Sequence, residues 1–189
     1  MSPPKTSLLA VITILALGAA ASGASAQMAM HDPMVGGAAM YPAKNIVENA
    51  VNSKDHTTLV AAVKAAGLVE TLEGPGPFTV FAPTNEAFDK LPPGTVATLV
   101  KPENKDQLVK ILTYHVVPGR LSTKEIMAQI KAGGGKAELT TVQGEPLTAT
   151  AMGGKIMLTD TKGGMAMVTI ANVYQSNGVI DVVDGVLMP

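Results

Sequence analysis

Four residues near the N-terminus have the types and spacing of a metal site. Met28, Met30, His31 and Met34 place three thioethers and one imidazole in one short segment. Soft sulfur ligands without a thiolate favour Cu(I) over harder ions. The chain holds 11 methionines in all, so general methionine usage would also produce such a segment. The sequence therefore leaves two interpretations open, a Cu(I) site and an incidental Met-rich segment.

The groups that catalysis normally requires are missing from the sequence. The chain has no cysteine, which excludes thiol catalysis, zinc–thiolate sites and iron–sulfur clusters. It contains no Gly-x-Ser-x-Gly elbow, and Gly135-Lys136 is followed by Ala137 where a phosphate-binding loop needs Ser or Thr. The acidic residues are scattered and form no calcium loop. We therefore predict a protein that is not an enzyme and uses no cofactor.

Residues 1–26 have the order of a secretory signal peptide. Lys5 precedes a mostly apolar run, and Ala24-Ser25-Ala26 has the form of a signal-peptidase site. The run is shorter than the roughly 20 residues that span a bilayer, although an uncleaved anchor helix is the alternative. Later residues contain no comparable run. We expect a secreted or periplasmic protein without a membrane span after cleavage.

Charge and aromatic content argue against a nucleic-acid partner. The chain carries 14 Lys and Arg against 15 Asp and Glu, and nucleic-acid binding usually needs a basic excess. Three Phe, three Tyr and no Trp offer few stacking platforms for single strands. We expect no nucleic acid among the partners.

Apolar periodicity predicts helices first and strands later. Residues 27–41 have no clean period and contain Gly36-Gly37, so we interpret them as a flexible lead-in. Helical spacing then indicates helices at about 43–52, 55–66 and 108–116, and a capping box at Ser122 to Glu125 begins another. One early strand at 78–82 runs into Thr84, a helix N-cap. After the glycines at 133–135 the period becomes strand-like, with runs at 137–142, 147–151, 156–159, 168–173 and 179–183. This segregation predicts an α+β domain at 42–189.

Two segments resemble the signatures of a known family. They are TVFAPTNEAF at residues 79–88 and NGVIDVVDGVL at residues 177–187, with Tyr114-His115-Val116-Val117 between them. Together they resemble the fasciclin (FAS1) domain, from about Pro42 to Met188. The resemblance implies the fasciclin-like fold, in which N-terminal helices pack on an antiparallel β-sheet wedge or sandwich.

The resemblance also implies a function and a site. Fasciclin domains serve adhesion, so it suggests a binding module whose partner is a cell-surface protein or polysaccharide. Similar proteins bind carotenoids, which makes a carrier of an apolar ligand the alternative. Met127, Met152, Met157, Met165 and Met167 could line an adaptable apolar pocket, or serve ordinary packing and the surface of the hairpins.

Three residues are candidates for binding. Tyr114 and His115 resemble a Tyr-His pair implicated in receptor binding by animal fasciclin domains. The apolar helical spacing around His115 favours instead a core histidine bonded to a nearby backbone group. Asp181 departs from the family, which commonly has His in an Asn-Gly-Val-Ile-His pattern. Strand alternation puts Asp181 on the face of Val179 and Val183, where a carboxylate needs donors or water.

Overall fold

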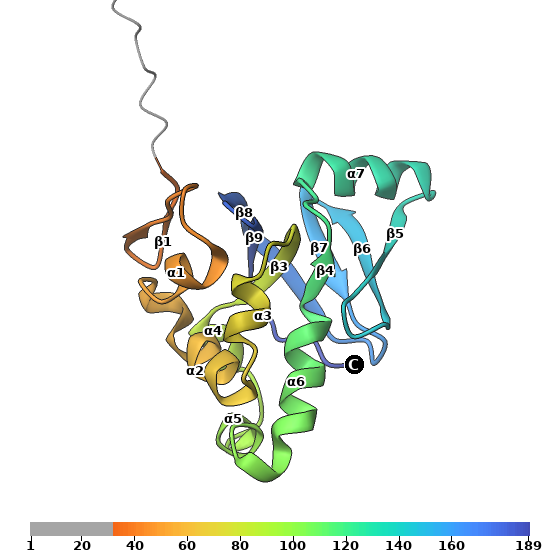
Figure 1. The fold of residues 1–189 in the computed structure, drawn as a ribbon. Helices are drawn as coiled ribbons and strands as arrows, with labels where there is room; N and C mark the ends of the chain where they lie inside the picture. The colour runs from red at the N-terminus through yellow and green to blue at the C-terminus, as the bar shows by residue number, and fades with distance from the viewer. Residues whose placement is uncertain (1–31) are drawn as a thin grey trace, which may run out of the picture. The chain divides into compact units, whose positions relative to one another are not determined.

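The structure is a computed structural model that describes residues 32–189. A seven-stranded sheet in the order β4-β3-β9-β8-β7-β6-β5 runs through this part of the chain (Figure 1). Its strands are β3 (Phe78–Pro83), β4 (Val116–Pro118), β5 (Lys136–Thr140), β6 (Pro146–Met152), β7 (Lys155–Thr159), β8 (Met165–Gln175) and β9 (Gly178–Val183).

One pairing in the sheet is parallel, unlike the antiparallel sheet that the sequence suggested. β3 runs parallel to β9 with Phe81 opposite Asp181, and the other pairings within this sheet are antiparallel. Because the partners are about a hundred positions apart in sequence, no local turn signal could indicate this pairing. The fold is nevertheless the expected α+β arrangement of helices on a mostly antiparallel sheet.

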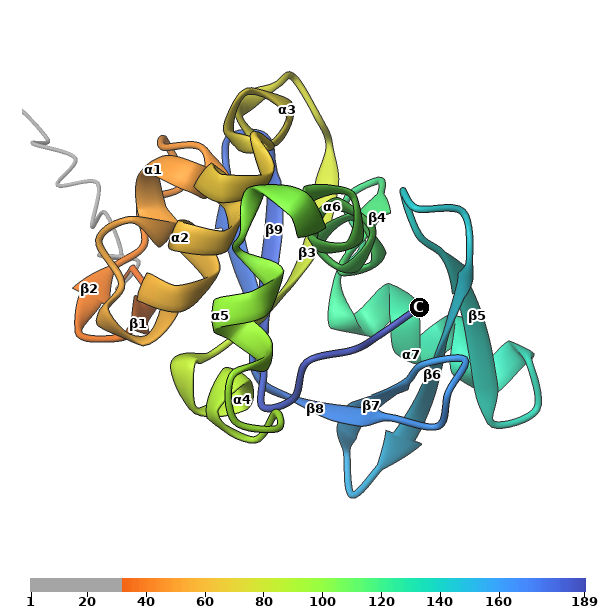
Figure 2. The same ribbon diagram turned by 90° about the horizontal axis from the view of Figure 1, so that it is seen from below.

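Most helices cover one side of the central strands (Figure 2). They are α1 (Ile46–Ala50), η1 (Lys54–His56), α2 (Thr57–Ala66), α3 (Val69–Glu73), α4 (Asn85–Asp89), α5 (Thr95–Leu99), η2 (Pro102–Asn104) and α6 (Lys105–Tyr114). Their apolar faces meet Val80, Ala82, Ile180 and Val182 in one buried core. Within residues 32–189 no helix is long and apolar enough to cross a membrane.

A second core lies on the other face of the central strands, where α7 (Thr123–Ala132) covers β5 and β6. It contains Phe81 and Val183 together with Ile126 of α7 and the inward residues of β5 to β8. Ser122 accepts a hydrogen bond from the Glu125 N–H, and the Glu125 carboxylate accepts one from the Ser122 N–H, so the predicted capping box is present.

The described part of the lead-in differs from the flexible segment that we predicted. β1 (Met34–Val35) and β2 (Ala38–Ala39) form a short hairpin around Gly36 and Gly37, both at positive φ. Val35 and Met40 are buried in the helix-side core. The segment is too short for a period to be visible, but its glycines form a turn between two paired strands.

Candidate functional site

The two signature segments form the centre of the molecule. β3 and β9 lie side by side, and every residue of β9 is buried. Side chains alternate between the two cores, so Ile180 faces the helices and Val183 faces the α7 side. Thr84 caps α4 by accepting from the Ala87 N–H, as predicted. Apolar packing and capping therefore account for most of these two segments.

Tyr114 and His115 both lie in the interior. The Tyr114 hydroxyl donates to the Pro146 carbonyl at 2.9 Å, and burial raises the pKa of this phenol. His115 Nδ1 donates to the Ile111 carbonyl at 2.8 Å, and its Nε2 accepts the Leu187 N–H at 3.1 Å. This pattern fits a neutral imidazole, and burial lowers its pKa. The predicted binding role of the pair stays a prediction.

His115 follows the last residue of α6 and stands between that helix and β4. The helix predicted to reach residue 116 thus ends at Tyr114. The apolar spacing continued past the helix because Val116 and Val117 are buried strand residues. Their pattern could not be separated from a helical face by periodicity.

Asp181 is fully buried, and only one of its two carboxylate oxygens has a hydrogen-bond partner. Its Oδ1 accepts the Asn172 N–H at 2.7 Å, and its Oδ2 has no hydrogen-bond partner. Burial raises the pKa of this carboxyl to about 6, although the Asn172 hydrogen bond acts in the opposite direction. Asp181 is 0% exposed. Its predicted role in binding stays a prediction.

The partner of Asp181 links the sheet to α7. Asn172 has φ 59 in a region where the register between β8 and β9 shifts. Its side-chain oxygen accepts the Thr123 N–H at 2.8 Å, and its Nδ2 donates to Thr123 Oγ1 at 2.6 Å. Asp181 therefore holds the bulged strand that positions the first turn of α7.

The proposed Cu(I) ligands fall mostly outside the described residues. Met28, Met30 and His31 precede residue 32, while Met34 lies in β1 with 59% of its surface exposed. Within residues 32–189, no group of three or more His, Cys, Asp and Glu could hold a metal ion. The lead-in site therefore stays a prediction.

An apolar cavity lies between the helices and the sheet. It is lined mainly by α1, α2, α3, α6 and β3, with His115 also in its wall, and its volume is about 60 Å³. None of the five methionines suggested as a pocket lining contacts this cavity. Those residues belong to α7 and to β6 to β8, on the other side of the molecule.

A shallow groove lies on the surface beside α7. Its volume is about 490 Å³, and it is lined by Arg120, Ser122, Lys124, Glu125, Ala128 and Tyr174. Tyr174 is 42% exposed. The guanidinium of Arg120 donates to the Gln175 and Ser176 carbonyls at 2.9 and 3.1 Å, which fixes its position. We call this surface the Arg120–Tyr174 groove.

Sequence reasoning missed the Arg120–Tyr174 groove. Arg120 and Tyr174 are far apart in the chain and meet because the end of β8 lies beside the loop before α7. A half-exposed tyrosine in a strand carries no local signal of its own. Only the α7 capping box, which supplies Ser122 and Glu125, marked this region in the sequence.

Comparisons with known proteins identify the class. The fasciclin domain model matches residues 54–189, and the chain belongs to the fasciclin domain family. The chain is similar to protein sll1483 of Synechocystis, 51% identical over 82% of this chain and 79% of that protein. It is 37% identical to the immunogenic protein MPB70 of Mycobacterium bovis, over 74% and 66% of the two chains.

Two further likenesses bear on location and fold. The cell surface glycolipoprotein MPB83 of Mycobacterium bovis is 34% identical over 98% of this chain and 81% of its own length. A solved FAS1 domain pair from the insect cell adhesion molecule Fasciclin I matches with a TM-score of 0.70. At 17% identity, over 78% of this chain and 52% of that one, it shows the fold alone.

Proposed function

We propose that this protein is a non-enzymatic adhesion module, secreted or periplasmic, that contacts a cell-surface protein or polysaccharide through the Arg120–Tyr174 groove. Membership of the fasciclin family supports this class. So does the similarity to MPB83, which is named as a cell surface glycolipoprotein and aligns with 98% of this chain.

The observation that carries the choice of surface is the position of Tyr174 beside Arg120. Tyrosine and arginine are enriched among the residues that dominate interface energies. A tyrosine ring offers an apolar face and a polar edge, which suits a sugar ring as well as a peptide. Arg120 is already held by two carbonyls, so little of its side-chain freedom remains to be lost on binding.

The groove also contrasts with the family-signature residues. Tyr114, His115 and Asp181 are at most 2% exposed, and their polar atoms mostly bond to neighbouring elements. A partner would have to open the fold to reach them. The groove residues meet solvent without any rearrangement, which makes them the better supported contact.

Adhesion through one groove is expected to be weak for a single copy. Linking several copies makes later contacts intramolecular and raises the overall affinity by orders of magnitude. The test therefore uses beads that carry many copies of the protein. We expect such beads to be retained on intact cells of the producing organism.

Variants of the groove test the choice of surface. Tyr174→Ala and Arg120→Ala should each reduce bead retention about fivefold or more, since hot-spot truncations cost over ~1 kcal/mol per contact. Tyr41→Ala is the matched control, because Tyr41 is 45% exposed but lies in the loop before α1. Equal retention of all four proteins would remove the groove from the proposal.

Chemical treatment of the cells separates the two partner classes. Periodate cleaves sugar diols, and protease removes surface proteins. Loss of retention after periodate alone indicates a polysaccharide, and loss after protease alone indicates a protein. If untreated cells never retain the beads, the adhesion proposal fails.

The alternative of a carotenoid carrier has weaker support. The apolar cavity is about 60 Å³, whereas sites for drug-sized ligands occupy roughly 300–1,000 Å³. The helix layer would have to separate from β3 to admit a long apolar molecule. A visible absorption band in protein purified from its native source would favour the carrier.

A further inference from the structure

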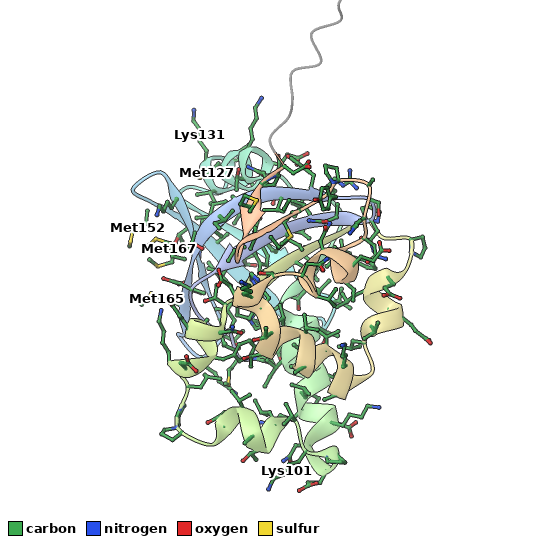
Figure 3. All side chains as sticks on the ribbon, turned by 90° about the vertical axis from the view of Figure 1, so that its left-hand side faces the viewer. Lys101, Met127, Lys131, Met152, Met165 and Met167 are labelled. Carbon is green, nitrogen blue, oxygen red and sulfur yellow. The ribbon has the colours of Figure 1, made fainter. Side chains whose placement is uncertain are left out.

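Four methionines share one face of the strands β6 to β8. They are Met152 in β6, Met157 in β7, and Met165 and Met167 in β8. The residues that alternate with them, including Ile156, Leu158, Ala166 and Val168, are buried in the α7-side core. Alternation therefore turns the four methionines to the opposite, outer face. Figure 3 shows Met152, Met165 and Met167 along one side of the molecule.

Met157 is the centre of this group. It lies directly opposite Met167 in the β7–β8 pairing, and Met165 is diagonal to it. In the β6–β7 pairing Thr150 is opposite Met157, so Met152 occupies the other diagonal. Directly opposite Cβ atoms are about 5 Å apart and diagonal Cα atoms about 7–8 Å. Unbranched methionine side chains with three rotatable bonds can close the gaps among Met157, Met165 and Met167. Met152 and Met165 lie on opposite diagonals, about 15 Å apart, and cannot reach one ion together.

These methionines are not part of the apolar cores. None of the four belongs to either core cluster or packs against one, whereas Met127 packs against the α7-side core. Met152 is 54% exposed and Met165 is 64% exposed. Met157 and Met167 are half-buried, so a ligand would reach the group from the solvent side of the sheet.

We propose that Met157, Met165 and Met167 form an all-thioether site for Cu(I). Thioethers are soft, neutral ligands that favour Cu(I) over Zn(II) and the hard divalent ions. No cysteine anywhere in the chain competes for the ion. The Asp184 carboxylate accepts the Met167 N–H at 2.7 Å at the edge of the group, and its other oxygen lies 4.0 Å from Lys90 Nζ, which partly balances its negative charge. Lys155 is opposite Met152 in the β6–β7 pairing, and its positive charge would repel a bound cation.

This site is separate from the predicted lead-in site. Met34 belongs to the β1–β2 hairpin, which pairs only with itself and packs at the helix-side core. The sheet-face group needs no residue before Met152. The two sites can therefore be tested independently in one protein.

Methionine methyl NMR gives a direct test. The full chain is labelled with ¹³C at the methionine methyl groups and titrated with Ag(I), a redox-inert substitute for Cu(I). We expect the methyl signals of Met157, Met165 and Met167 to shift together and to saturate at one ion. The signals of Met127, Met40 and Met188 should stay in place, and Zn(II) should shift none of the three.

Variants complete the experiment. With Met28, Met30 and Met34 replaced by Leu in every protein compared, the triple variant M157L/M165L/M167L should bind Cu(I) at least about tenfold more weakly in competition with a chromogenic chelator, because the sheet-face site has lost its three thioethers. M127L is the matched control and should bind as the wild type does. Unchanged affinity of the triple variant contradicts the proposal. Methyl shifts confined to Met28, Met30 and Met34 also contradict it, and assign the ion to the lead-in.

Discussion

His115 is bonded at both ring nitrogens, to Ile111 on its own helix and to Leu187 near the C-terminus. His115→Ala would leave the buried Leu187 N–H without an acceptor and create a cavity. We expect a loss of about 2–4 kcal/mol in the free energy of unfolding, measured by urea denaturation. Wild-type stability combined with lost bead retention would instead assign His115 to binding.

The same residue sets a pH dependence. Burial lowers the folded-state pKa of His115, and of the buried His56, below the ordinary value of 6.5. The unfolded chain therefore binds protons first as pH falls. The free energy of unfolding therefore has its full value above about pH 6.5, where both imidazoles are neutral in the folded and the unfolded chain. It decreases as pH falls from 6.5 toward the folded-state pKa values of the two histidines. Urea midpoints of the wild type and of His115→Ala across pH 5–8 measure this loss.

The titration of Asp181 changes the free energy of unfolding in the opposite direction. Its folded pKa of about 6 lies above the ordinary 3.8, so the buried charge costs stability above pH 6, and protonation relieves that cost as pH falls toward 4. Asp181→Asn cannot titrate. The stability of the wild type relative to this variant should therefore rise by about 2 kcal/mol between pH 8 and pH 4.5. A difference that does not change with pH would contradict the raised pKa.

At the scale of elements, Asn177 ties the β8–β9 turn to two helices. Its Oδ1 accepts the Ile46 N–H at 3.0 Å, and its Nδ2 donates to the Leu72 and Gly74 carbonyls at 2.7 and 3.0 Å. Asn177→Ala should cost about 3 kcal/mol, because buried backbone groups of α1 and α3 lose their partners.

Asn52→Ala is the control for this prediction. Asn52 also donates to a backbone carbonyl, that of Glu48 at 2.7 Å, but the side chain is exposed. Its removal should cost less than about 1 kcal/mol because water can replace it. Equal losses for the two variants in thermal unfolding would show that the β8–β9 turn is not held by Asn177.

Local signals in the sequence predicted the element ends well. Gly67 ends α2 in the left-handed conformation, and Thr84 and Ser122 cap α4 and α7 as expected. Such features depend on residues a few positions apart. The parallel β3–β9 pairing and the Arg120–Tyr174 groove depend on residues distant in sequence, and no local pattern encodes them. Asp181 was predicted to share a face with Val183, but only the structure shows its link through Asn172 to α7.

At the scale of the whole molecule, the chain builds two apolar cores on the two faces of the same central strands. The signature strands β3 and β9 separate a helix-side core from an α7-side core and contribute side chains to both. The residues that identify the fasciclin family are therefore largely those that build it. We therefore place the proposed recognition on surfaces such as the Arg120–Tyr174 groove, which can vary without disturbing either core.

Retention of protein-coated beads on intact cells tests this division most directly, using the wild type, Tyr174→Ala, Tyr41→Ala and His115→Ala at a temperature where all four are folded. We predict that Tyr174→Ala loses retention about fivefold or more, while Tyr41→Ala and the folded His115→Ala keep it. Retention that survives in Tyr174→Ala but disappears in folded His115→Ala would contradict it.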